Sequence, residues 1–176
     1  MAYQHSSACA EYFDRDRYTS SQAGERVLNE AIVQAEIIEG FDECLKIFDA
    51  FYDDDVEVSS ETQAEPIRGK ARVRSLLFNF LVPFHVMAEV GGLSISIRAT
   101  AIPADTSGET HSAWTLDLVA PFGTTCTLSW CALRKWDGSR VVYEHHYDRR
   151  MSGGPLTFDD FRLNASEHAA GFRMPS

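Results

Sequence analysis

The sequence has few cysteines and no long apolar run. The four cysteines form no CxxC pair, and no HxH or HExxH spacing is present, so the sequence predicts no metal site. No stretch of about 18 apolar residues is available to span a bilayer. The first residues lack the basic region followed by an apolar segment that is typical of a secretory signal. We therefore expect a cytoplasmic protein with reduced thiols and no membrane partner.

Basic residues are also scarce, since 16 Lys and Arg stand against 26 Asp and Glu, a formal net charge of −10. Because phosphate contacts need a surplus of basic side chains, this balance argues against a nucleic-acid partner. The sequence contains neither a GxSxG turn nor a glycine-rich phosphate loop. We therefore expect no serine nucleophile of that type and no cofactor.

The 176 residues are 44% hydrophobic, which is typical of one globular domain. Residues 1–22 are polar and irregular, and we interpret them as a flexible N-terminal arm. The domain itself is expected over 23–150. The segment 151–176 is too apolar for a free linker, so we expect this C-terminal extension to pack on the domain or on a partner. Its large apolar residues are Leu156, Phe158, Phe161, Leu163 and Phe172.

The apolar periodicity divides the chain into a helical part and a strand part. Spacings of three and four predict helices over 25–39, 42–52 and 70–81. Pro83 is expected to end the third helix. Beyond a short strand at 56–58, alternating residues predict strands over 86–90, 93–102, 110–119, 124–136 and 140–148. Short turns favour antiparallel pairing, so we expect an α+β fold with three helices on a curved antiparallel sheet and a ligand site between the layers.

The densest polar cluster lies on the last predicted strand. Alternation places one polar set on one face, Glu144, His146 and Asp148, and a second set on the other, Tyr143, His145 and Tyr147. Amphipathicity alone favours the second set as the buried face, because it is the more apolar. Asp117 is a carboxylate within an otherwise apolar strand, so it either faces outward or needs a buried partner.

Three segments resemble one known group of proteins. They are Phe51-Tyr-Asp-Asp-Asp-Val56, Arg68-Gly69-Lys70 and Trp136-Asp-Gly-Ser-Arg-Val-Val-Tyr-Glu-His-His-Tyr-Asp148. These are similar to motifs of the SnoaL-like group of the NTF2-like (cystatin-like cone) superfamily, over roughly residues 25–150. Members include polyketide cyclases, ketosteroid isomerases, scytalone dehydratase-like and limonene epoxide hydrolase-like enzymes, and binding relatives. The resemblance implies a cone-shaped sheet with helices over its concave side.

The resemblance also implies residue roles. Asp148 falls on the closing aspartate of the last-strand motif, which is a catalytic base in the epoxide hydrolases, and Asp117 falls near their second aspartate. The arginine of that family falls at Thr115, and the ketosteroid isomerase base falls near Ser60, so neither set is matched in full. We expect Asp148, Asp117 and His146 to converge inside the cone as catalytic residues. The expected substrate-binding residues are Tyr143, Tyr147, Trp114, Trp130 and His111.

Two functions follow as hypotheses. The first is a cofactor-free enzyme that uses acid–base catalysis on a small, largely apolar, oxygenated substrate, as an isomerase, cyclase, dehydratase (a lyase) or hydrolase, with epoxide hydrolysis the least favoured. The alternative is a non-catalytic small-molecule-binding or interaction module of the same fold. Because helices cover only one face of the expected sheet, we also expect a homodimer through the convex face.

Overall fold

The computed structural model describes residues 21–35, 41–102, 108–121 and 123–154. Within them the chain forms three helices, α2 (Ser21–Gln34), α3 (Phe41–Phe51) and α4 (Lys70–Gly91). It also forms six strands, β1 (Tyr52–Ser60), β2 (Ile67–Arg68), β3 (Ser94–Ile102), β4 (Glu109–Val119), β5 (Thr125–Asp137) and β6 (Arg140–Gly153). None of these helices is both long and apolar enough to cross a membrane. The predicted arm and most of the predicted C-terminal extension lie outside the described residues.

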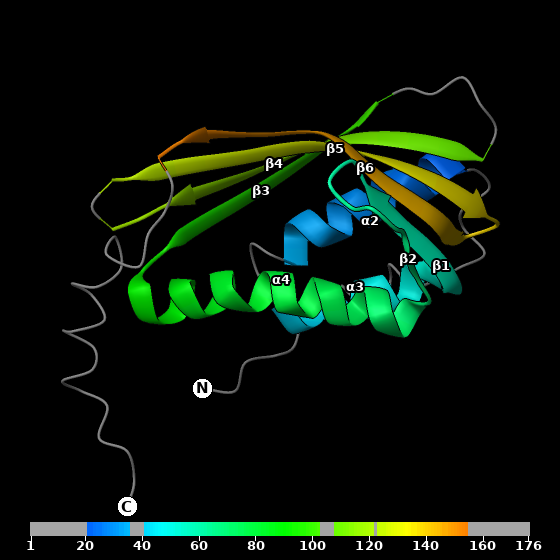
Figure 1. The fold of residues 1–176 in the computed structure, drawn as a ribbon, viewed down its shortest axis with the longest axis horizontal. Coiled ribbons are helices and arrows are strands. Elements are labelled where there is room, and N and C mark those ends of the chain that lie inside the picture. The colour runs from blue at the N-terminus through cyan, green and yellow to red at the C-terminus, as the bar shows by residue number, and fades with distance from the viewer. Residues whose placement is uncertain (1–20, 36–40, 103–107, 122, 155–176) are drawn as a thin grey trace, which may run out of the picture.

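The strands form one curved sheet in the order β2-β1-β6-β5-β4-β3 (Figure 1). Strands β3 to β6 are a sequential antiparallel meander, which confirms the pairing predicted from the short turns. The prediction that every strand pair is antiparallel is wrong for β1, which runs parallel to β6. These two strands are far apart in sequence, so no hairpin fixes their direction, and the intervening segment supplies the crossover that a parallel pair needs.

The helices lie on one side of the sheet, which confirms the predicted α+β fold (Figure 1). Helix α4 spans the open side of the curve, because it contacts β1 and β2 toward one end and β3 toward the other. Helix α2 contacts β3 and β4, and α3 packs against α2 and α4. The concave face of the sheet is therefore the face that the helices cover.

Helix α4 continues through Pro83 to Gly91, so the predicted helix end and the predicted strand over 86–90 are wrong. A proline inside a helix removes a backbone hydrogen bond at a cost of about 3 kcal/mol. Burial of apolar side chains beyond the proline offsets that cost. The residues concerned pack against apolar side chains of β3, β4 and β5, and they are Phe84, Met87 and Ala88. Gly92 then ends the helix in the left-handed conformation, with φ of 69°.

Among the described residues, the interior contains two apolar clusters. The first joins α2, α3 and β1 through residues such as Leu28, Phe48 and Val56. The second lies between α4 and strands β3 to β5, and its buried members are Leu93, Leu116, Leu118, Ala120 and Cys126. Along the inward face of β5, Trp136 belongs to the first cluster and Cys126 to the second. Between them on the same face of β5 lies Arg134, the centre of the candidate site.

Candidate active site

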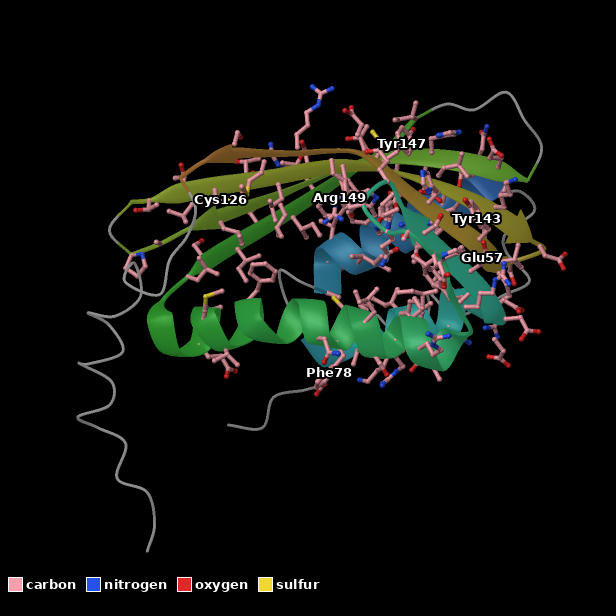
Figure 2. All side chains as sticks on the ribbon, viewed as in Figure 1. Glu57, Phe78, Cys126, Tyr143, Tyr147 and Arg149 are labelled. Atoms are coloured by element: carbon pink, nitrogen blue, oxygen red, sulfur yellow. The ribbon has the colours of Figure 1, made fainter. Side chains whose placement is uncertain are left out.

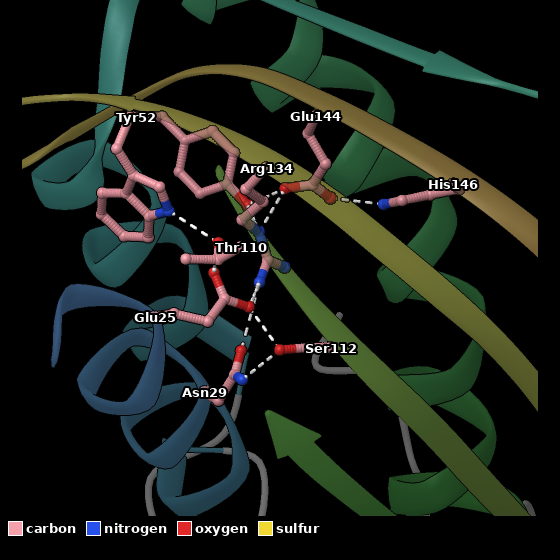
Figure 3. A network of polar contacts seen from close by, with 9 residues as sticks. Glu25, Asn29, Tyr52, Thr110, Ser112, Arg134, Glu144 and His146 are labelled. Atoms are coloured by element: carbon pink, nitrogen blue, oxygen red, sulfur yellow. Dashed lines mark hydrogen bonds and ion pairs between the residues drawn. The ribbon is translucent and has the colours of Figure 1, made fainter. Parts of the chain in front are cut away.

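A network of buried polar side chains occupies the band between the two apolar clusters (Figure 3). Its centre is Arg134 on β5, whose side chain is 4% exposed. The Arg134 Nη1 donates to Glu25 of α2 at 2.6 Å, and its Nε donates to Glu144 of β6 at 2.7 Å. One guanidinium therefore joins two buried carboxylates, and it ties the first helix of the domain to the last two strands.

On the helix side, the network directs hydroxyl protons toward Glu25. The Trp136 Nε1 donates to Thr110 Oγ1 at 2.8 Å, and Thr110 donates in turn to Glu25 at 2.7 Å. In the same way Asn29 Nδ2 donates to Ser112 Oγ at 2.6 Å, and Ser112 donates to Glu25. Because both hydroxyls already accept a hydrogen bond, their own protons are free to point at the carboxylate. Glu25 is the acceptor in each of these hydrogen bonds.

On the strand side, Glu144 is bound by three neighbours. Tyr52 Oη donates to its carboxylate, Arg134 pairs with it, and His146 Nε2 contacts its second oxygen. Burial alone would raise the pKa of Glu144, but the Arg134 guanidinium, together with the contacts from His146 and Tyr52, outweighs burial and holds the pKa far below its usual range. Burial raises the pKa of Tyr52, so this phenol stays protonated as a donor. Glu144 is therefore a permanently charged group inside the protein.

His146 is where the network reaches the surface. Its side chain is 31% exposed, whereas the Glu144 side chain is 7% exposed. The imidazole lies 6.4 Å from the ring of Trp130, and Trp130 stacks on Trp114 with 5.9 Å between ring centroids. Among the described residues, none forms a hydrogen bond with His146 Nδ1. The site thus presents an imidazole that is fixed at one nitrogen and open at the other, beside two indole rings.

This arrangement is suited to proton transfer. In a neutral imidazole one nitrogen carries the proton and the other accepts. Since the ionised Glu144 can only accept, a neutral His146 in this contact would carry its proton on Nε2 and its free lone pair on Nδ1. A base in this orientation takes a proton at Nδ1, and the adjacent carboxylate stabilises the imidazolium that forms.

Solved structures with the same architecture differ greatly in sequence. A computationally designed 17-OHP binder is 12% identical and has a TM-score of 0.50, covering 74% of this chain and 97% of its own. An NTF2-like protein of unknown function from Cytophaga hutchinsonii is 11% identical, with a TM-score of 0.49 and coverage of 72% and 96%. A protein from Mesorhizobium loti described as a SnoaL-like polyketide cyclase is 12% identical, with a TM-score of 0.48 and coverage of 71% and 96%. The chain has the NTF2-like fold.

At these identities the likeness concerns the NTF2-like fold alone. No family model matches the sequence, and no curated protein matches it significantly. Within residues 21–35, 41–102, 108–121 and 123–154, no three or more His, Cys, Asp and Glu side chains are grouped so as to hold a metal ion. The functional site of this chain is therefore inferred from the local geometry of its own side chains.

The NTF2-like sheet separates the predicted catalytic residues onto two faces. His146 faces inward, as the resemblance implied and amphipathicity did not. Asp117 lies on the outer face of β4, because Trp114 and Leu116 occupy the inward phase of this strand. The prediction that Asp117 converges with His146 is therefore wrong.

Asp117 has partners on its own face of the sheet. It accepts from Thr127 at 2.7 Å and pairs with Arg98 at 2.6 Å. The Thr127 hydrogen bond and the Arg98 guanidinium hold the pKa of Asp117 below its usual value. This carboxylate is accounted for by pairing between neighbouring strands on the outer face.

Asp148 also lies away from the network. Strand β6 is irregular between Tyr147 and Arg150, and Asp148 adopts a left-handed conformation there, with φ of 51°. The irregularity breaks the alternation that would have continued the inward phase from His146. The Asp148 side chain is 49% exposed, and Arg150 binds both of its oxygens at 2.9 and 3.1 Å. The prediction that Asp148 points into the cone is wrong for this reason.

The predicted substrate-binding residues divide in the same way. Trp114 and Trp130 lie on the inward face beside the network. The other three lie on the outer face, away from His146. They are His111 of β4 and the two tyrosines of β6, Tyr143 and Tyr147 (Figure 2). There His111 Nδ1 lies 3.0 Å from the Tyr147 hydroxyl. These three side chains cannot contact a molecule that is bound at His146.

Glu25 and Arg134 were not predicted as site residues, although each is a charged residue at an apolar position of the sequence pattern. Glu25 precedes Leu28 by three residues and so lies on the apolar stripe of α2. Arg134 has the same phase on β5 as the buried Ala132 and Trp136. An acid on one apolar stripe and a base on another indicate a buried pair, because neither charge is stable there alone.

Proposed function

We propose that this chain is a cofactor-free acid–base enzyme in which His146 moves a proton on a small, largely apolar, oxygenated substrate, in a reaction of the isomerase, cyclase or dehydratase type. The observation that supports it is the half-exposed imidazole bound to a buried, ionised Glu144, which Arg134 holds in place. A surface histidine has no need of such an anchored carboxylate, whereas a proton-transfer group gains orientation and charge stabilisation from it.

In the proposed reaction, His146 Nδ1 removes a proton from a carbon next to a carbonyl group. The imidazolium is stabilised by Glu144 and returns the proton to another position of the same molecule. Tyr52 and Arg134 keep the carboxylate from turning away, since both bind its Oε2 while His146 occupies Oε1. Trp130 gives the substrate an apolar aromatic surface next to the imidazole. A solved structure with the same architecture is a computationally designed 17-OHP binder.

The test uses 1-tetralone, an apolar bicyclic ketone, and follows exchange of its α-protons with D2O by NMR. This readout reports proton transfer without knowledge of the natural substrate. We expect the wild-type chain to accelerate exchange and His146→Gln to slow it by about 10²-fold or more, the range of a general base. The matched control is His145→Gln, because His145 is the adjacent histidine on the outer face and is expected to change the rate less than twofold. Asp117→Asn and Asp148→Asn are expected to behave like this control. Exchange no faster than in buffer, or an unchanged rate in His146→Gln, would contradict the proposal.

A non-catalytic binding module is the second candidate function. The observation that favours it is that the carboxylates, hydroxyls and guanidinium of the network are already bound to one another, so the network can serve structure alone. Such a module binds 1-tetralone without accelerating exchange, and His146→Gln leaves its affinity unchanged. Measuring affinity and exchange on the same samples therefore separates the two functions.

A further inference from the structure

We infer that the indole N–H of Trp114 is the hydrogen-bond donor for the substrate's carbonyl oxygen. This inference rests on the proposed function, because it concerns the same site and names the group that the substrate must carry. Trp114 faces inward on β4, and its side chain is buried, with 3% of the residue exposed. Its Nε1 is also buried and has no hydrogen-bond partner among the described residues. A buried donor without a partner is costly, and a bound oxygen would satisfy it.

Trp136 provides a comparison within the same network. Its Nε1 donates to Thr110 Oγ1 at 2.8 Å, so this indole is fully bonded in the free protein. Trp114 Nε1 is the one buried side-chain nitrogen or oxygen without a partner in the described part of the chain. The missing partner is therefore particular to Trp114. The acceptors of the network, Glu25, Asn29 and Glu144, all have hydrogen-bond partners of their own.

Trp114 and His146 both neighbour Trp130, and Arg134 links them indirectly. Trp130 stacks on Trp114 at 5.9 Å, nearly parallel at 7°, and lies 6.4 Å from the His146 ring. Arg134 lies 5.6 Å from the centre of the Trp114 ring and binds Glu144, the partner of His146. Trp130 therefore neighbours both the unpartnered indole of Trp114 and the imidazole of His146, which would offer a bound ketone a proton donor and a proton acceptor. That is the pair of groups that enolisation of a ketone uses.

The chemistry of an indole defines the ligand. Trp Nε1 donates and never accepts, and it carries no charge, so it suits a neutral acceptor such as a ketone or aldehyde oxygen. The Arg134 cation over the ring draws electron density from it and strengthens the N–H as a donor.

The proton and electron pairs balance in the resulting step. The α-proton moves to His146 Nδ1, the C–H electron pair forms the C=C bond, and the C=O π pair moves to oxygen. The Trp114 hydrogen bond to that oxygen strengthens as negative charge develops, while the indole keeps its proton. Return of the proton from His146 to carbon restores the carbonyl group and the neutral imidazole.

The experiment compares 1-tetralone with 1-methylenetetralin, in which a CH2 group replaces the carbonyl oxygen with little change of shape. The dissociation constant of each is measured for wild-type chain, Trp114→Phe and Trp136→Phe. Taking the ratio of the two constants and comparing it between variants removes the difference in solvation of the two probes. We expect Trp114→Phe to lower the relative preference for the ketone about tenfold, which corresponds to about 1.4 kcal/mol. Trp136→Phe is expected to leave the ratio unchanged.

A second measurement needs no change at Trp114. The indole N–H resonance of Trp114, assigned by elimination with Trp130→Phe and Trp136→Phe, is expected to shift with 1-tetralone and not with 1-methylenetetralin. An equal ratio in wild-type chain and Trp114→Phe, equal shifts with both probes, or no binding of either probe would overturn the inference. In His146→Gln the ratio is expected to stay at the wild-type value. Loss of α-proton exchange in wild-type chain with the ratio intact would therefore refute the proposed catalysis and leave the donor role of Trp114 standing.

Discussion

Replacement of Glu144 by Gln tests whether the buried network holds the fold together. The substitution keeps the shape and removes the charge, so Arg134 loses one of its two carboxylate partners. Breaking a buried ion pair from one side costs about 3–5 kcal/mol, because the remaining charge stays buried without compensation. Gln retains one acceptor oxygen, so we expect the lower end, about 3 kcal/mol. For a chain of this length that is a fall in melting temperature of about 6–12 °C.

The matched control is Glu57→Gln. Glu57 also pairs with an arginine at a similar distance, but its pair is exposed to solvent. Glu57 pairs with Arg68 at 2.8 Å, but the side chains are 31% and 72% exposed. A pair in solvent contributes about 0–1 kcal/mol. Urea unfolding at pH 7 should therefore separate the two variants by about 2 kcal/mol or more. Equal free energies of unfolding for the two variants would refute the reasoning from burial.

The pH dependence gives an independent check on the same residue. The pKa of Glu144 is lower in the folded chain than in the unfolded one, so the unfolded chain binds this proton more tightly. The resulting stabilisation is complete above the unfolded pKa of about 4.3 and is lost as the pH falls below it. The difference in unfolding free energy between wild-type chain and Glu144→Gln should thus shrink as the pH is lowered from about 6 to about 3, a range that brackets the unfolded pKa. A difference that stays constant over that range would show that the charge of Glu144 is not the cause.

Two further predictions concern the sheet. Gly153→Ala should destabilise the chain by about 2–4 kcal/mol, because an added Cβ would lie 2.2 Å from the Thr125 carbonyl oxygen at a φ of +88°. Gly123→Ala has a similar φ of +85° with nothing within 4 Å. It should cost only about 1–2 kcal/mol of backbone strain, so equal melting temperatures for the two variants would contradict the role of the close approach. We also propose that the outer sheet face pairs with a second copy of the chain, and light scattering should then give twice 19.7 kDa. A single-chain mass at micromolar concentration would exclude this pairing.

The strand part of the fold was predictable because its signals are local. Alternation along β4 and β5 and the glycine turns between strands depend only on neighbouring residues, and these two strands begin and end within one residue of the predicted bounds. The direction of β1 was not predictable in this way. It depends on which strand lies beside β1 once the sheet has formed, and β1 and β6 are separated by the whole meander.

Helix α4 and the site show two other limits. Pro83 has an unfavourable local effect, and the helix continues because residues after it are buried against strands that appear later in the sequence. To predict the candidate site, one must know which face of each strand points inward. Glu144 and His146 share a face, but the irregularity at Asp148 ends that alternation. The resemblance identified the correct face at His146 and failed two residues later, at the point where the strand itself departs from regular geometry.

The ion pair between Glu25 and Arg134 has a consequence for the order of events during protein synthesis. The two residues are 109 positions apart, and a ribosome that adds about 5–20 residues per second needs about 5–20 s to go from one to the other. Throughout that interval Glu25, Asn29 and the apolar stripe of α2 have none of their β5 contacts. The buried ion pair of α2 is completed only when β5 has emerged. A nascent chain that stops before β5 therefore leaves Glu25 without the cation that pairs with it in the folded chain.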